Sequence, residues 1–172
     1  MNGRQNEQKN HAFYRKISEC RNLLSIDKKY PIFGREKTGR QMELSKTFHF
    51  DMAHRLSFHT GKCRNLHGHS YRLEVTLEGE PDANGMLIDF HEMKRIVHEH
   101  VVDILDHATV IYEKDRLLMD SFPKELHHVI FPYEVTAENL CRWTFERLLN
   151  AGLTIKQVVI WETADSKAVY TK

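Results

Sequence analysis

Three histidines in two separate segments have the spacing to hold one metal ion. His67 and His69 stand two residues apart in the run CRNLHGHSY, so in an extended strand both rings point to the same side. His54 ends an earlier segment, FHFDMAH, on the parity of its apolar residues. Three imidazoles suit Zn²⁺ and leave a fourth position open, as catalytic zinc sites do. The alternative is that all three are exposed residues at strand ends.

A cysteine precedes this pair of histidines by four residues. Cys63 could be a fourth ligand in a closed structural site, or a thiolate beside the cation that acts as nucleophile or base. It could also be an inert thiol. Cys20 and Cys141 lie among apolar residues at helical spacing, and we interpret both as packing residues.

Two acidic positions complete the candidate chemistry. Asp106 directly precedes His107 and could hold its ring in one tautomer, as in a proton relay, although His107 could equally cap a helix. Glu162 shares the parity of Val158 and Ile160, which predicts a carboxylate on an apolar face. Such a carboxylate is costly unless paired. A ligand with two adjacent N–H donors, such as a pterin or guanine edge, would pair it, and so would an internal salt bridge.

The surrounding pattern predicts the elements that position these groups. Period-two alternation predicts strands that end at His54 and run from His69 to Glu78. Asp89 and Glu92 fit a capping box before a helix whose apolar stripe starts at Phe90 and continues every three to four residues. The long connection 108–134 is functional or holds an element of its own.

The C-terminal part predicts one more helix and two more strands. Thr136 can cap a helix that runs to Gly152, with Glu138 in its first turn. Strands at 156–163 and 167–171 follow. The order predicts an α+β fold, a four-stranded antiparallel sheet with two helices on one face.

Length and composition suit one domain with an extension. The chain has 172 residues, 41% of them hydrophobic and 28% charged. Residues 1–46 hold 11 Lys and Arg against 5 Asp and Glu. We therefore expect a basic, partly helical extension over 1–40 and one domain over 41–172. The extension is a solvated arm or, less simply, recruits RNA.

Several classes of protein fit the sequence poorly. No apolar run approaches the ~18 residues of a membrane span, and the first residues lack a signal-peptide core. Three cysteines match no disulfide framework, so we expect a cytoplasmic protein. No Gly-rich phosphate loop and no basic–aromatic platform is present, so a nucleic acid is not an expected partner. Because no apolar run is long enough for a membrane span, a membrane is not an expected partner either.

Taken together, the motifs resemble a known family. FHFDMAHRL, CRNLHGHSYRLEVTLEG, GMLIDFHEMK, LDH, TAEN and WETADSKAVY are similar, in this order over about residues 44–171, to the 6-pyruvoyltetrahydropterin synthase family. The resemblance implies the tunnelling fold, in which trimers close their sheets into a barrel and two trimers commonly stack as a hexamer. The spacing C-x3-H-x-H resembles the 6-carboxytetrahydropterin synthase branch of queuosine biosynthesis.

The resemblance also implies roles for the candidate residues. It places zinc ligands at His54, His67 and His69, the base at Cys63, the relay at Asp106 and His107, the pterin anchor at Glu162 and supporting contacts at Thr136 and Glu138. The implied reaction converts 7,8-dihydroneopterin triphosphate to 6-carboxytetrahydropterin, acetaldehyde and triphosphate. The alternatives are 6-pyruvoyltetrahydropterin synthesis, a related dihydropterin reaction, or a noncatalytic zinc-stabilised binding module.

Overall fold

A computed structural model describes residues 41–172, which belong to one compact unit, Arg40–Lys172. The expected basic extension over 1–40, its helix and Cys20 lie outside the described residues. No helix of the described part is both long and apolar enough to cross a membrane.

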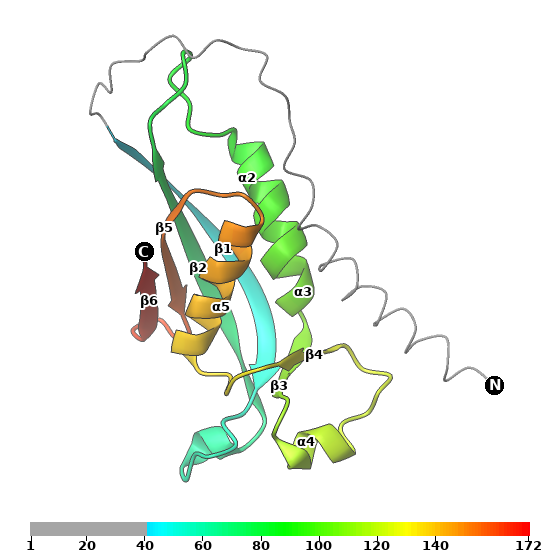
Figure 1. Ribbon diagram of the computed structural model, residues 1–172. Helices are drawn as coiled ribbons and strands as arrows, with labels where there is room; N and C mark the ends of the chain where they lie inside the picture. The colour runs from blue at the N-terminus through cyan, green and yellow to red at the C-terminus, as the bar shows by residue number, and fades with distance from the viewer. Residues whose placement is uncertain (1–40) are drawn as a thin grey trace, which may run out of the picture. The chain divides into compact units, whose positions relative to one another are not determined.

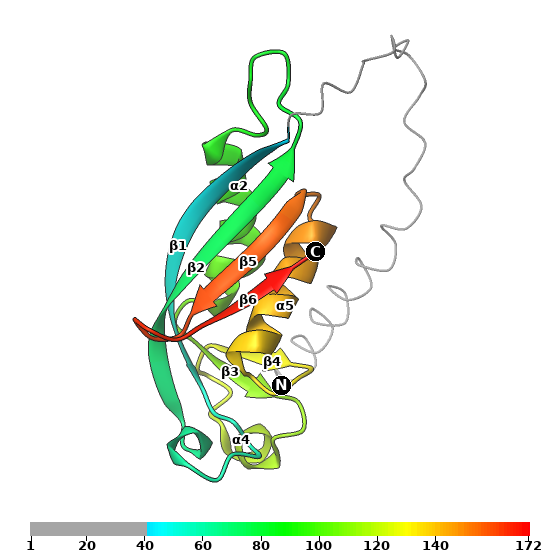
Figure 2. The same cartoon turned by 90° about the vertical axis from the view of Figure 1, so that its left-hand side faces the viewer.

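Four antiparallel strands form the main part of the sheet (Figure 2). They are β1 (Met42–His54), β2 (His67–Gly79), β5 (Ile155–Trp161) and β6 (Lys167–Thr171), and they lie side by side in that order. The four strands predicted from the sequence are therefore present, with shifted ends. β1 and β2 pair without interruption from Met42↔Gly79 to His54↔His67.

The sheet is larger than predicted and is mixed. The long connection contributes β3 (Ala108–Tyr112) and β4 (His128–Phe131), with α4 (Arg116–Ser121) between them. β3 runs parallel to β1 and β4 runs parallel to β3, which gives the order β4-β3-β1-β2-β5-β6. The prediction of a purely antiparallel, four-stranded sheet is thus incomplete. The extra strands form because they bury side chains such as Val110, Ile111 and Phe131.

Two helical segments cover one face of the sheet (Figures 1 and 2). The first consists of α2 (Phe90–Val97), a π-helical turn (His98–Val102) and α3 (Asp103–Leu105). The second is α5 (Ala137–Asn150). The Asp89 side chain accepts a hydrogen bond from the backbone N–H of His91 and caps α2, as predicted. Glu92 instead bonds Arg95, so the capping box is half formed.

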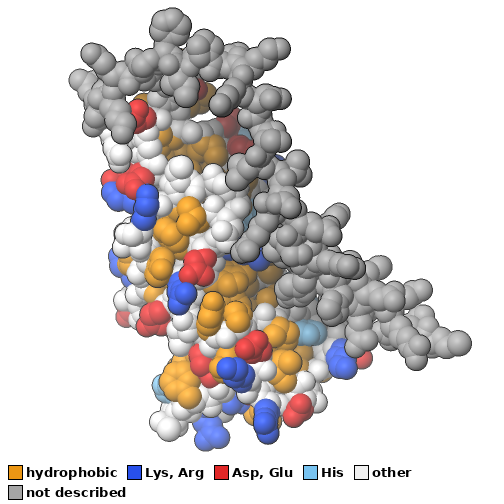
Figure 3. Space-filling model, viewed as in Figure 1, with side chains coloured by type: hydrophobic (Ala, Val, Ile, Leu, Met, Phe, Trp, Pro, Cys, Tyr) orange, Lys and Arg blue, Asp and Glu red, His pale blue; other side chains and the backbone are white. Residues whose placement is uncertain are grey.

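The core lies between this face and the helices. Phe48, Phe50 and Met52 of β1 are buried beside Tyr71 and Leu73 of β2, as the period-two pattern predicts. Each fully buried apolar side chain of this size contributes ~1.5–3 kcal/mol. On the helix-covered side of the molecule, charged side chains of both signs lie among apolar ones (Figure 3). The buried apolar side chains hold the sheet against the helices, and the polar groups of the candidate site lie at the ends of its strands.

Cys141 is a core residue, as predicted. Its side chain is fully buried in α5, and its thiol donates a hydrogen bond to the carbonyl of Val158 over 3.1 Å. Burial raises the pKa of this thiol to about 11. The group is therefore inert near neutral pH.

Candidate active site

The ends of β1 and β2 bring the three predicted histidines together. His54 lies directly opposite His67 in the antiparallel register, and His69 lies opposite Met52. The ring centroids are 4.7 Å apart for His54 and His67, 5.0 Å for His67 and His69, and 5.4 Å for His54 and His69. One ring nitrogen of each lies within 4.8 Å of the others. The group thus has the spacing of ligands to a single ion.

Hydrogen bonds fix the tautomers in a form that suits a metal. The Nδ1 atom of His54 lies 2.7 Å from the Val135 carbonyl, and Nδ1 of His67 lies 2.8 Å from the Asn65 carbonyl. A carbonyl oxygen only accepts, so both Nδ1 atoms carry the proton and both Nε2 atoms keep a lone pair. Nε2 of His69 is buried without a hydrogen-bond partner. These residues therefore fit Zn²⁺, which binds neutral imidazole.

Burial supports the same protonation state. His54 is 2% exposed, and this desolvation is the main reason why its pKa lies below the ordinary value of 6.5. Its ring is consequently neutral at neutral pH, the form that can donate a lone pair to a cation.

Glu162 reaches the histidines from the end of β5. One of its oxygens, Oε1, lies 3.4 Å from Nε2 of His54 and 3.8 Å from Nε2 of His69. The hydroxyl of Tyr71 donates a hydrogen bond to the same oxygen over 3.3 Å. Glu162 thus lies on the same face of the sheet as the histidines, the apolar face that its parity with Val158 and Ile160 predicts. The structure shows no Lys or Arg ion pair for Glu162 among residues 41–172.

Tyr71 is a site residue that the sequence analysis missed. It is 1% exposed, and its hydroxyl lies 3.2 Å from Nε2 of His54. Burial, followed by the charge of Glu162, raises the pKa of this phenol. The available signal was its position, two residues after His69 on the same strand face.

Cys63 lies in the loop between β1 and β2. It is half-buried in a short 3-10 turn, Lys62–Arg64, and its carbonyl accepts a hydrogen bond from the Leu56 backbone over 2.9 Å. Within the described chain, its sulfur does not belong to the group of atoms that could share one ion with the histidines. This placement fits three protein ligands with an open position better than a closed four-ligand site.

Asp106 and His107 form a pair at the end of α3. Their side chains meet at 3.0 Å between Nδ1 and Oδ2. The Asp51 backbone N–H donates to Oδ1 of Asp106 over 2.9 Å, and this bond is the main reason why the pKa of Asp106 lies below its ordinary value. His107 is 78% exposed and has a positive φ of 58°. The pair is therefore held in place from Asp51 while its imidazole stays accessible.

A shallow pocket of about 350 Å³ lies beside this pair, and its lining includes Asp51, Ser70 and His107. Asp51 and Ser70 stand opposite each other, one position away from Met52 and His69, so their side chains face the other side of the sheet from the histidine rings. Gly68 lies in its wall. A Cβ at Gly68 would stand 3.0 Å from the carbonyl oxygen of Met52, so the close approach of β1 favours glycine here.

Thr136 and Glu138 occupy the start of α5. The Thr136 hydroxyl accepts a hydrogen bond from the Asn139 backbone over 3.2 Å, which confirms the predicted cap. Glu138 is exposed in the first turn. These positions account for helix capping and dipole compensation; a contact to a ligand stays a prediction.

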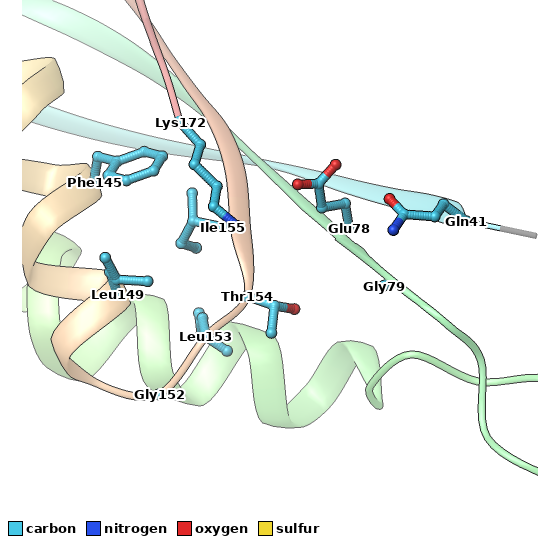
Figure 4. Close-up of a pocket in the computed structure, with 10 residues that line it drawn as sticks. All are labelled: Gln41, Glu78, Gly79, Phe145, Leu149, Gly152, Leu153, Thr154, Ile155 and Lys172. Atoms are coloured by element: carbon cyan, nitrogen blue, oxygen red, sulfur yellow. The ribbon is translucent and has the colours of Figure 1, made fainter. Parts of the chain in front are cut away.

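A second pocket lies at the far ends of the same strands (Figure 4). It measures about 430 Å³, and its wall is largely apolar, with Phe145, Leu149 and Leu153. It contains Gly79, the last residue of β2, whereas His67 is the first. The histidine group is thus remote from it, and we assign the chemistry to the other end.

Comparison with known proteins settles the family. The sequence profile described as 6-pyruvoyl tetrahydropterin synthase matches residues 43–172. The chain belongs to the 6-pyruvoyl tetrahydropterin synthase family. This confirms the resemblance that the motifs suggested.

Relatives within the family share a more specific name. A Haemophilus influenzae protein named 6-carboxy-5,6,7,8-tetrahydropterin synthase is 37% identical over 137 residues, which cover 74% of this chain and 97% of that protein. A protein of the same name from Aquifex aeolicus is 36% identical over 157 residues, with 74% and 96% covered. The sequence of this family member therefore groups with that branch.

Solved structures agree on the fold. A Plasmodium vivax 6-pyruvoyltetrahydropterin synthase superposes with a TM-score of 0.63 at 22% identity, over 77% of this chain and 98% of that one. The Caenorhabditis elegans 6-pyruvoyl tetrahydropterin synthase gives 0.59 at 26% identity, with 77% and 96% covered.

Proposed function

We propose that this chain is a zinc-dependent 6-carboxytetrahydropterin synthase, a lyase that converts 7,8-dihydroneopterin triphosphate to 6-carboxytetrahydropterin, acetaldehyde and triphosphate. The family and the name shared by its relatives support a pterin side-chain lyase. The observation that carries the proposal is the convergence of three imidazoles and the Glu162 carboxylate at one end of the sheet. By the same relationship we assign the product to queuosine biosynthesis.

His54, His67 and His69 would hold the zinc ion. Zn²⁺ bound there supplies a Lewis acid that makes protons on the hydroxyl-bearing side chain of the substrate easier to remove. The Val135 and Asn65 carbonyls keep two of the ligands in the correct tautomer.

Glu162 would fix the pterin ring. Its carboxylate can accept two parallel N–H bonds from the amino-pyrimidinone edge, which positions the side chain near the histidines. Its other contacts leave this capacity free, since Tyr71 donates to Oε1 only. Thr136 and Glu138 would support the ring from the start of α5.

Cys63 and the Asp106–His107 pair would move protons. The Cys63 thiolate takes a proton from the substrate side chain, and His107, oriented by Asp106, returns or relays one. Because His107 is exposed, its ring can serve a site completed by a second copy of the chain. We accordingly propose a cytoplasmic homo-oligomer, a trimer or hexamer, as in the family.

Product analysis tests the reaction. Zinc-loaded protein is incubated with 7,8-dihydroneopterin triphosphate, and the products are identified by mass. Acetaldehyde together with 6-carboxytetrahydropterin supports the proposal, whereas 6-pyruvoyltetrahydropterin without acetaldehyde identifies the alternative synthase.

A variant separates the enzyme from a zinc-stabilised binding module. Cys63→Ala should abolish turnover and keep one zinc ion per chain. Loss of zinc in this variant would instead show that Cys63 is a ligand in a closed site, and full activity would reject its role as base.

A further inference from the structure

The loop that carries Cys63 is fastened to the segment in front of α5. The Glu134 carboxylate accepts one hydrogen bond from the backbone N–H of Ser57 over 3.0 Å, and a second from the Ser57 hydroxyl. Both carboxylate oxygens of Glu134 accept a hydrogen bond, so the pair of bonds fixes the orientation of Ser57 relative to the carboxylate as well as its distance from it. The residue before Ser57 is Leu56, whose N–H donates to the carbonyl of Cys63. A displacement of Ser57 is thereby passed on to Cys63.

A second carboxylate holds the same loop two residues closer to the metal group. Asp115, the residue before α4, forms an ion pair with Arg55 at 3.1 Å between Oδ2 and Nε. Asp115 is 4% exposed and Arg55 is 12% exposed. Nε of Arg55 has no well-aligned hydrogen bond, so the contact is chiefly a charge interaction.

The loop needs such outside contacts because it has little structure of its own. Between His54 and His67 the chain leaves the sheet and forms only turns and the short 3-10 segment. Irregular loops are the parts of a protein that open most readily. In three consecutive residues of this loop, Arg55 pairs with Asp115, Leu56 bonds Cys63 and Ser57 bonds Glu134. These contacts therefore determine where the sulfur of Cys63 lies.

We propose that Glu134, supported by Asp115, is a positioning residue for Cys63. Neither carboxylate belongs to the groups that could bind the ion. Both come from the long connection between α3 and α5, which thus acts on the reaction through the loop. The kinetic part of this inference rests on the proposed function; the position of the thiol does not.

The experiment measures thiol reactivity and catalysis on the same variants. Glu134→Ala, Glu134→Gln and the control Glu125→Gln, an exposed glutamate of the same connection, are prepared in a Cys20→Ser background. Each is assayed for the alkylation rate of Cys63 by iodoacetamide, zinc per chain, melting temperature, and kcat and KM.

We expect Glu134→Ala to change the alkylation rate of Cys63 several-fold and to lower kcat by about 10- to 100-fold, the effect of misplacing a reacting group by ~1 Å. KM and zinc content should stay at the control values, because the ring anchor and the ligands are unchanged. Glu134→Gln should show a smaller effect, since its amide oxygen still accepts from the Ser57 N–H.

A Cys63 alkylation rate equal to that of the control overturns the proposal, whether or not the variant retains zinc. If Glu134→Ala does not fold, Ser57→Ala removes one hydroxyl only and must shift the thiol rate in the same direction. A wild-type chain without synthase activity would refute the proposed function, and the alkylation rates would still decide the role of Glu134.

Discussion

Removing the hydroxyl of Tyr71 tests how Glu162 is held beside the histidines. Tyr71→Phe deletes one oxygen and keeps the ring, which stacks on Phe50 with centroids 5.3 Å apart and planes 11° from parallel. The change therefore leaves the packing intact and removes the hydroxyl that donates to Oε1 of Glu162.

The expected loss of stability is about 1 kcal/mol. A hydrogen bond to a charged group contributes ~1.5–3 kcal/mol, and a neutral one ~0.5–1.5 kcal/mol. The Tyr71–Glu162 bond is 3.3 Å long, well beyond the ~2.7–2.8 Å typical of O–H···O bonds, and Glu162 is 28% exposed. We therefore take the neutral value, which lowers the melting temperature by about 2–4 °C in a chain of this size.

Urea denaturation of the metal-free protein measures this loss. The matched control is Tyr112→Phe, a half-buried tyrosine of β3 whose hydroxyl forms no hydrogen bond within residues 41–172. With substrate, a less constrained Glu162 should raise KM about fivefold, the equivalent of ~1 kcal/mol, and leave zinc content unchanged. A Tyr71→Phe variant as stable as the control, or one destabilised by more than about 3 kcal/mol, would refute the reasoning.

Three further predictions concern the metal, the thiols and the acid. Zinc at 100 times its dissociation constant should stabilise the wild type by ~2.7 kcal/mol, and His69→Ala should abolish this gain in a melting assay with and without chelator. In a Cys20→Ser background at pH 8, iodoacetamide should alkylate Cys63 while Cys141, buried and with a thiol pKa of about 11, reacts only after unfolding; equal rates would contradict the burial. Asp106 has a folded pKa below 3.8, so its stabilisation is complete above that value and disappears as the pH falls through the folded pKa. The difference in the free energy of unfolding between wild type and Asp106→Asn should accordingly shrink in acid. A difference that does not depend on pH would contradict the stabilising role of ionised Asp106.

Period-two alternation made the central strands and the metal group predictable. His54 shares the parity of the buried residues of β1, and His69 that of β2, so antiparallel pairing had to bring them to one face. The same parity argument placed Glu162 correctly, although it lies one residue beyond β5. Local pattern was sufficient because a strand determines the direction of its side chains.

Other features depend on contacts that a local pattern does not contain. β3 and β4 are only five and four residues long and need each other and β1 to form. Phe90 fits the apolar stripe of the helix but is 46% exposed, because it stands at the first position of α2, where it meets solvent. Val135 acts through its carbonyl, so no side-chain motif could identify it.

The contacts of Glu162 distinguish between the roles left open by its sequence. An internal salt bridge would need a permanent cation. Within residues 41–172, the only basic groups at ion-pair distance from Glu162 are two histidines, one of them held neutral by burial. Once the Nε2 lone pairs of those histidines point to an ion, neither ring can donate a hydrogen bond to Glu162. Tyr71 then remains as the donor to Oε1, and no residue of the described chain donates to Oε2. Glu162 is 28% exposed, and Oε2 is not among the buried atoms that lack a partner, so this oxygen is open to solvent and to the N–H groups of a ligand. The proposed ring anchor requires an accessible carboxylate oxygen beside the three imidazoles, and the contacts of Glu162 within residues 41–172 leave Oε2 available for it.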